Sequence, residues 1–197
     1  GALYVEYTGN NPNDEYGVRV IGGSQYPVLD VTRAKTEEER RELIDAYVEE
    51  MIEYVPKIEA LHNADQDNEK SHYALSKKNC ILGATDIVLD QVMYSVPIKQ
   101  VYKSITGNNE SAEEAAEKLS QSLTAMDEMV HLFYQHKGLS ENPVIGGTTY
   151  GKDKLPTTRL NIRYQRMFAG AFMYAGGLHI GIEWDSSTLV GGSVPVK

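Results

Sequence analysis

The chain has 197 residues, of which 41% are hydrophobic and 24% charged. This composition is that of an ordinary globular domain, so it excludes a disordered chain, a collagen and a small disulfide-stapled protein. The formal net charge of −9 disfavours nucleic-acid binding, because a negative surface repels phosphate backbones. Cys80 is the single cysteine, so no intramolecular disulfide can form, and we interpret its thiol as buried and inert.

The sequence contains no apolar run of the ~18 residues that a membrane span needs. Its first residue is Gly1 and not Met, which indicates either a processed terminus or a remnant left after removal of a leader.

Residues 1–35 predict strands and an extended arm. Apolar and polar residues alternate over 3–7 and 16–21, and a run of turn formers separates the two segments. This pattern predicts a hairpin with a long loop, closed by Gly22–Gly23. The segment from Tyr26 to Val31 is expected to be extended, because Pro27 restricts the residue before it.

The spacing of apolar residues changes at residue 36, from every second residue to every third or fourth. Thr36, with Glu39 three residues later, forms a capping box, and apolar residues at three-and-four spacing follow it. They predict a long amphipathic helix to about His62, kinked at Pro56 because proline removes a backbone donor.

Two more long helices are predicted before residue 138. The second runs over 73–105, bends at Pro97 and stops at Gly107, and its apolar stripe includes Val88, Val92 and Val96. The third opens with a capping box from Ser111 to Glu114 and ends at Gly138. Short connections favour packing of the three helices as an antiparallel bundle.

The remaining residues give mixed signals. Glycine and proline punctuate 139–157, which predicts a long loop. The segment from Thr157 to Ala175 fits a helix and, at its start, a strand; we favour the helix because Gly176–Gly177 is a natural stop. Further strands are expected at Leu178–Ile182, 188–190 and 194–196.

The predicted fold class is therefore α+β. Three long helices form an antiparallel bundle and, with a fourth helix, pack on a small antiparallel sheet built from N- and C-terminal strands. We expect one domain over 1–197, divided into an arm at 1–35, the bundle at 36–138, the loop at 139–157, and a helix with strands at 158–197.

Few residues suggest catalysis or metal binding. His179 and Glu183 are four apart; on a helix they would share an ion, but on a strand they stand roughly 13 Å apart with Gly181 between them. The oxygen-rich run over 63–69 lacks the glycine and the final glutamate of a calcium loop. The chain has no nucleophile elbow, phosphate-binding loop or H-E-x-x-H motif, and no cofactor is predicted.

Two compositional features suggest contacts with other proteins. The chain has 13 tyrosines against 3 phenylalanines and 1 tryptophan, which suits either interfaces or the edge of a core. Charge is also uneven: the net charge is −8 from Thr36 to Lys70 and +3 from Tyr150 to Lys197. The two segments could pair within the fold or between copies. The candidate interface residues are Arg159, Arg163, Arg166, Glu38, Glu42, Asp45, Glu49 and Tyr150.

These features favour a non-enzymatic structural or assembly subunit of a virion, filament or surface complex. It would act through protein partners, chiefly copies of itself, in an extracytoplasmic or virion-associated location. One alternative is an extracytoplasmic helical module that binds a small ligand in a tyrosine-lined pocket between helices kinked at Pro56 and Pro97. A second alternative is a metal-dependent enzyme that uses His179, Glu183 and Asp185.

Overall fold

The computed structural model describes residues 17–22, 25–64, 83–107, 111–140, 144–145, 148–149, 153–154, 159–165 and 171–184. Its main sheet contains β1 (Val28–Asp30), β2 (Ala84–Val88), β3 (Val92–Pro97), β8 (Leu160–Gln165), β9 (Met173–Gly176) and β10 (His179–Glu183). The helices are η1 (Val31–Arg33), α1 (Glu37–Ala64), α2 (Ile98–Thr106) and α3 (Ala112–His136). Short strands β4 (Leu139–Ser140), β5 (Val144–Ile145), β6 (Thr148–Thr149) and β7 (Asp153–Lys154) pair as β4 with β7 and β5 with β6.

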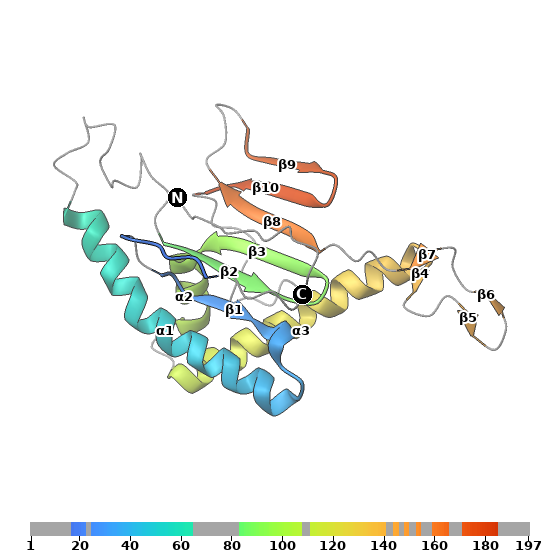
Figure 1. Ribbon diagram of the computed structural model, residues 1–197, viewed down its shortest axis with the longest axis horizontal. Coiled ribbons are helices and arrows are strands. Elements are labelled where there is room, and N and C mark those ends of the chain that lie inside the picture. Colours follow the sequence, from blue (N-terminus) through green and yellow to red (C-terminus); the bar gives the residue numbers. More distant parts are fainter. Residues whose placement is uncertain are drawn as a thin grey trace.

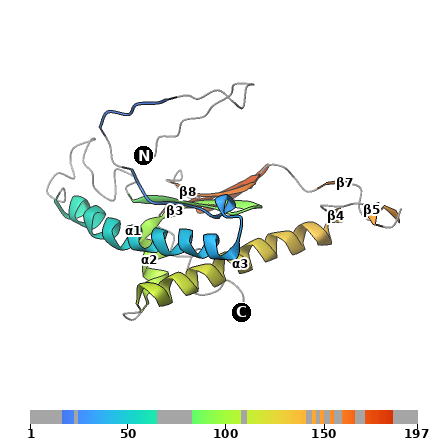
Figure 2. The same cartoon turned by 60° about the horizontal axis from the view of Figure 1, so that its bottom comes forward.

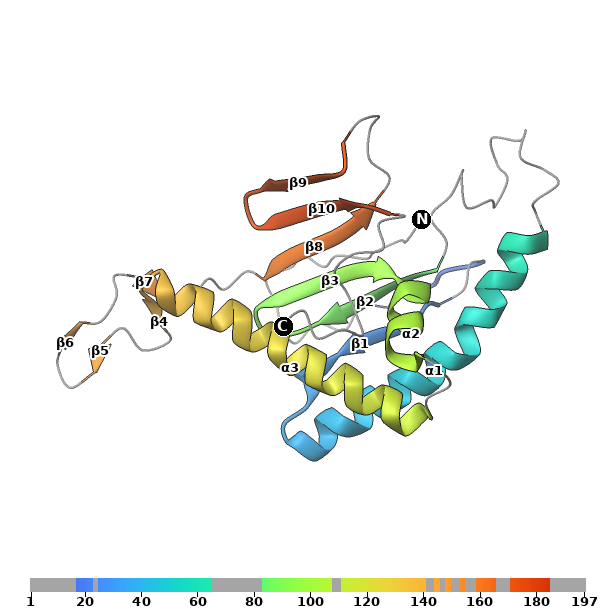
Figure 3. The same ribbon diagram turned by 180° about the vertical axis from the view of Figure 1, so that it is seen from behind.

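The six-stranded sheet is mixed, with the order β1–β2–β3–β8–β10–β9 (Figure 1). Strand β1 runs parallel to β2, β3 parallel to β8, and β8 parallel to β10, whereas the β2–β3 and β9–β10 pairs are antiparallel. All three α-helices lie against one face of the sheet (Figures 2 and 3). The opposite face carries no described helix, and β9 forms one edge.

The hydrophobic core lies between the helices and the sheet. Alternate residues of the strands point into it, as the two-residue period of a half-covered sheet requires. Fully buried members include Leu29, Ile87, Val92 and Val96 from the sheet, and Ile44, Met51, Leu119 and Leu123 from α1 and α3. None of the helices in the described ranges has the length and apolarity of a membrane span.

One buried hydrogen-bond chain ties α1 to the sheet. The hydroxyl of Thr85 donates to the backbone carbonyl of Pro27 at 2.7 Å, and lies 2.7 Å from the hydroxyl of Tyr47. Because the single hydroxyl proton of Thr85 goes to a carbonyl that can only accept, Tyr47 must donate to Thr85. Burial raises the pKa of Tyr47 far above its ordinary value, which keeps this donor protonated.

Local signals place the long helices correctly. The capping box at Ser111 and Glu114 is complete, and α3 ends just before Gly138, whose φ is +78°. At α1 the hydroxyl of Thr36 accepts from the backbone N–H of Glu39, as expected, while the Glu39 carboxylate accepts from the N–H of Lys35. The predicted first and third helices are thus confirmed, with Pro56 inside α1.

The predicted three-helix bundle on a small terminal sheet is wrong, although an α+β arrangement remains. The described part of the predicted second helix is the β2–β3 hairpin followed by α2, which begins directly after Pro97. Its valine stripe misleads because a spacing of four is nearly one helical turn and also an even number. Val92 and Val96 therefore fit the two-residue period of β3 equally well, whereas Val88 lies on β2 and shares the opposite face with Met93. β-Branched residues also favour strands.

The predicted fourth helix is also wrong. Its described residues form β8 and the start of β9. Gly176 ends β9 and Gly177 lies in the turn into β10, so this pair is not a helix stop. The alternation of apolar and polar residues from Leu160 to Tyr164 was the correct signal, because this segment is strand β8. Strand β10 is confirmed. Residues 18–21 form no strand, and the other predicted strands, over 3–7, 188–190 and 194–196, lie outside the described residues.

The buried hydrogen bonds from Tyr47 to Thr85 and from Thr85 to Pro27 give a stability prediction. Tyr47→Phe removes one donor while Thr85 keeps its carbonyl partner, so we expect unfolding to require about 1 kcal/mol less. Thr85→Val leaves both the tyrosine hydroxyl and the Pro27 carbonyl without their partner and is expected to cost about 2 kcal/mol or more. Urea denaturation of both variants checks the order; a costlier Tyr47→Phe would contradict it.

Asp127 on α3 gives a pH prediction. Burial, and then the nearby charge of Asp90, raises the pKa of Asp127, and its Oδ1 has no hydrogen-bond partner among the described residues. A raised folded-state pKa means that ionisation subtracts stability as the pH rises through that value. We expect Asp127→Asn to stabilise the protein at pH 7 by roughly 1 kcal/mol or less, with the gain shrinking at acid pH.

Thermal unfolding from pH 4 to pH 8 measures this difference. Asp45→Asn is the matched control, because Asp45 is paired with Arg41 at 2.9 Å and its neutralisation offers no such gain. Equal stability of Asp127→Asn and wild type at every pH would refute the assigned cost of the buried charge.

Candidate functional site

Strands β8, β10 and β9 carry polar and aromatic side chains on the face that points away from the helices, which we call the open face. Strand pairing places these residues in three rows across the sheet. The rows are Gln165–Glu183–Phe172, Arg163–Gly181–Tyr174 and Asn161–His179–Gly176.

The ring of Tyr174 lies across Gly181 at the centre of the open face. A Cβ atom added to Gly181 would stand only 2.0 Å from Cε1 of Tyr174, so glycine alone leaves room for the ring. The Tyr174 hydroxyl accepts from the side-chain amide of Gln165 at 3.3 Å, and its ring meets His179 edge to face at 5.3 Å between centroids. Tyr174 therefore links three strands and orients the imidazole of His179.

Two arginines make the neighbouring part of the sheet basic. The exposed Arg163 donates through Nε to the side-chain oxygen of Asn161 at 3.2 Å. Arg159, just before β8, donates to the backbone carbonyl of Leu89 at 2.6 Å and is also exposed. Arg163 pairs with Gly181 in the register and uses only Nε in its bond, so its charge lies beside the open face.

Strand β9 is an edge with outward-facing backbone groups. Glu183 donates its backbone N–H to the carbonyl of Phe172 at 2.9 Å, so this pair is hydrogen-bonded. In an antiparallel ladder the bonded pairs alternate, which directs the N–H and C=O groups of Met173 and Ala175 away from β10. Apolar side chains flank this edge: Phe172 is 57% exposed, Met173 55% and Leu178 42%.

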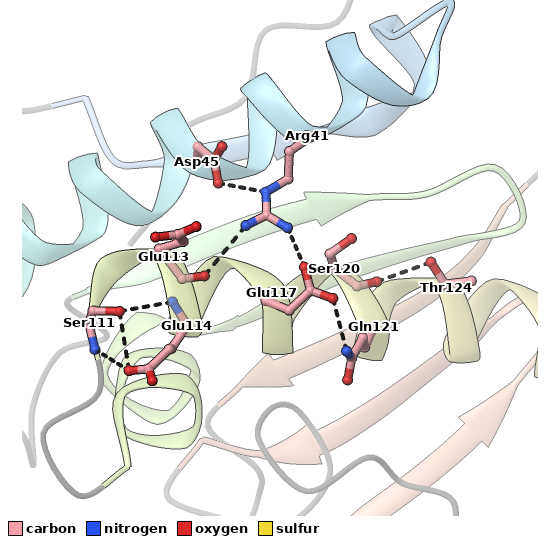
Figure 4. Close-up of polar contacts among 9 residues, drawn as sticks. All are labelled: Arg41, Asp45, Ser111, Glu113, Glu114, Glu117, Ser120, Gln121 and Thr124. Carbon is pink, nitrogen blue, oxygen red and sulfur yellow. Dashed lines mark hydrogen bonds and ion pairs between the residues drawn. The ribbon is translucent and has the colours of Figure 1, made fainter.

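A separate hollow of about 630 Å³ lies between α1 and α3. Arg41 lines it and pairs with Asp45 at 2.9 Å and with Glu117, which lowers the pKa of that glutamate (Figure 4). Its lining is charged and not tyrosine-rich, unlike the pocket expected for a small-ligand module. Because its central cation is already paired with two carboxylates, we interpret the hollow as a polar joint between helices.

The predicted interface residues do not come together. Glu38, Glu42, Asp45 and Glu49 lie on α1, on the helical side of the sheet, whereas Arg163 lies on the open face. Among the described residues no ion pair joins Arg159 or Arg163 to α1. Arg166 and Tyr150 lie outside the described residues. A role for these residues in binding other proteins stays a prediction.

The predicted metal pair falls on a strand. His179 and Glu183 lie at opposite ends of β10, with Gly181 between them on the same face. A strand rise of about 3.3 Å per residue separates them by roughly 13 Å, too far for one ion. Within the described ranges no three histidine, cysteine or acidic side chains are grouped to hold a metal. Asp185 lies outside those ranges.

Sequence reasoning missed β9 as an edge strand of the sheet and Tyr174 as the side chain that spans Gly181. The available signal was the Tyr174–Ala175–Gly176–Gly177 run before an alternating strand, which is typical of a hairpin when the preceding segment is extended. The helix expected over Thr157–Ala175 concealed it.

No protein-family model matches this chain, and no curated protein shows significant sequence similarity to it. Solved structures do show similarity in fold. The M60 catalytic domain of ZmpC from Clostridium perfringens, in complex with the sialyl T antigen, is 16% identical with a TM-score of 0.48, covering 84% of this chain and 25% of that one. The ZmpB metallopeptidase of C. perfringens is 17% identical with a TM-score of 0.48, covering 82% and 24%.

A metallopeptidase from Bacteroides thetaiotaomicron is 12% identical with a TM-score of 0.39, covering 85% of this chain and 19% of that one. The chain thus spans a quarter or less of the length of these three proteins. The likeness concerns the fold and assigns no substrate or reaction to this chain.

These comparisons contradict the predicted structural or assembly subunit, and with it the expectations of a homo-oligomer and of no enzymatic activity. The similar solved structures are an M60 catalytic domain, the ZmpB metallopeptidase and the catalytic module of the metalloprotease ZmpA. The sequence-based alternative of a metal-dependent enzyme named His179 and Glu183 as ligands, and β10 does not bring this pair together.

The contact between Tyr174 and Gly181 gives a further prediction. Gly181→Ala must displace the tyrosine ring, so we expect a loss of about 1 kcal/mol or more in urea unfolding, although alanine normally suits a strand better than glycine. Gly176→Ala is the matched control, because its added Cβ would meet only His179 Cε1 at 3.8 Å. The double variant Gly181→Ala with Tyr174→Ala should abolish the steric part of the loss; a loss that persists in full would point to another cause.

Proposed function

We propose that this chain binds an extended polypeptide along β9, and that this polypeptide is the substrate of a metal-dependent peptidase in which the chain forms a substrate-binding part. The edge of β9, which pairs with β10 alone among the described strands, carries this proposal. The likeness to metallopeptidase domains contributes only the class of reaction that is named.

The support from β9 is both geometric and chemical. The outward N–H and C=O groups of Met173 and Ala175 offer the hydrogen bonds that an added strand needs. Native proteins commonly protect such edges with charges, proline or a bulge. Strand β9 and its flanks instead present Phe172, Met173 and Leu178, which are exposed and apolar. An extended polypeptide would satisfy the backbone groups and cover these side chains.

The metal of such an enzyme does not fit the described residues, because they offer no group of three candidate ligands. We therefore assign no chemical step to them. The part that these residues play in the proposal is binding and orientation. Hydrogen bonds from β9 would hold the substrate backbone extended, and the open face and the opposite face would contact alternate side chains.

An extracytoplasmic location, expected from the sequence, is compatible with the comparisons and belongs to this proposal. The virion-associated location was tied to the structural subunit that the comparisons contradict.

Proline at position 175 tests the edge directly. The N–H of Ala175 points away from β10, so Ala175→Pro removes an outward donor without breaking the β9–β10 ladder. We expect it to weaken binding of a fluorescein-labelled eight-residue peptide of alternating threonine and valine by about tenfold, the equivalent of one lost hydrogen bond. Fluorescence anisotropy measures the change.

Ala175→Thr is the matched control, because it keeps the N–H and suits a strand; it should bind the peptide as wild type does. Two peptides, N-methylated at the odd or at the even amides, supply the reciprocal test. Only alternate N–H groups of an added strand face β9, so only one of the two peptides should lose affinity. Adding EDTA should leave binding unchanged, because the contacts are made by backbone groups. Equal affinities for Ala175→Pro and Ala175→Thr would refute the proposed edge.

A further inference from the structure

We propose that His179 makes the β9 edge selective for polypeptides with an acidic residue at the position opposite Gly176. This inference rests on the proposed function and names the class of peptide that the edge takes. It is based on the position of His179, which lies opposite Gly176 of the edge strand β9.

Gly176 leaves a gap in the edge strand beside the imidazole. His179 lies opposite Gly176 in the register, one strand in from the edge. A Cβ atom at Gly176 would stand 3.8 Å from Cε1 of His179, so the ring leans over the glycine toward the edge. A strand added to β9 would lie about 4.8 Å beyond it. A long side chain on that strand, opposite Gly176, can therefore reach the imidazole without crossing another side chain of β9.

Tyr174 holds the imidazole in this position. Its ring packs edge to face against His179, and the tyrosine is itself fixed over Gly181 and by the side-chain amide of Gln165. The imidazole is exposed but oriented, so a ligand side chain meets a ring that loses little freedom on binding.

The groups around His179 favour a carboxylate. An imidazole donates a hydrogen bond from a ring nitrogen in either protonation state, and a carboxylate only accepts. On β8, Asn161 lies beside His179 in the register and is bonded to the cationic Arg163. The acid on this face of β10 is Glu183, which lies at the other end of the strand beside Phe172. The Gly176 end of the open face is thus basic, and the Phe172 end is acidic and apolar.

The selected peptide therefore has a stated pattern. Residues opposite Gly176 and Phe172 are four positions apart and face the same side of the sheet. We expect glutamate opposite Gly176 and an apolar residue opposite Phe172, which is 57% exposed. An acidic residue opposite Phe172 would meet Glu183 and is disfavoured.

A double-mutant cycle tests the selection. The probes are the labelled threonine–valine peptides with one threonine, at each position in turn, replaced by glutamate or by glutamine. At the position opposite Gly176, we expect wild-type protein to bind the glutamate peptide about fivefold more tightly than the glutamine peptide, as for an exposed hydrogen bond to a charged acceptor beside the cationic Arg163. His179→Ala should reduce this ratio to about one, and raising the salt concentration should lower it.

Two further variants serve as controls. Glu183→Gln lies on the same strand and face and should leave the preference at the Gly176 position unchanged. His179→Gln keeps a donor and should retain part of the preference. Far-UV circular dichroism checks that each variant folds.

The possible failures are distinguishable. Peptides that bind wild type and lose affinity with Ala175→Pro, but show the same glutamate preference in His179→Ala, would overturn this inference and leave the proposed function standing. Absence of peptide binding to wild-type protein would overturn both.

Discussion

The parallel pairing of β3 with β8 holds the molecule together as one sheet. It joins the strands packed over the helices to the three strands that form the open face, and its register pairs Met93 with Asn161 and Ser95 with Arg163. A slip of one residue would turn Arg163 toward the helices and bring Ile162 and Tyr164 to the open face. Tyr164 is 4% exposed, and burial raises its pKa to about 12, so its place in the core opposes such a slip.

Helices α1 and α3 could be predicted from the residues of the helices themselves. Their capping residues and apolar stripes lie within the helix itself, so neither signal depends on a distant partner. The β2–β3 hairpin was not predictable in the same way. A four-residue spacing of valines fits both periods, and the decision came from β1 and β8, which lie far away in the sequence and pair with its two strands. Tertiary pairing overrode the helical pattern there.

The candidate site shows the same division between residue type and arrangement. Arg159, Arg163 and His179 were selected from the sequence because of their charge and their ability to bind ligands. Arg159 and Arg163 were grouped by a helix that the structure does not have, whereas His179 and Glu183 lie on a strand, as their alternating segment indicated. Edge position cannot be read from a strand's own residues, since it depends on the order β8–β10–β9. The glycine at 181 becomes informative only once Tyr174 is known to lie across it.

Net charge is a poor guide to what the β9 edge attracts. The chain as a whole carries −9, which would repel an acidic peptide at long range. Helix α1 contacts β1, which lies at the opposite edge of the sheet from β9, five strand spacings of about 4.8 Å away. Its acids are therefore farther from β9 than the Debye length of ~10 Å at 0.1 M salt. At physiological ionic strength a peptide at β9 therefore experiences mainly the groups of β8 and β10. There Arg163, in the central row, donates to Asn161 beside His179, and Glu183 lies at the other end of β10, so the local order of polar and charged groups along the strand, and not the net charge, decides which side chain is accepted.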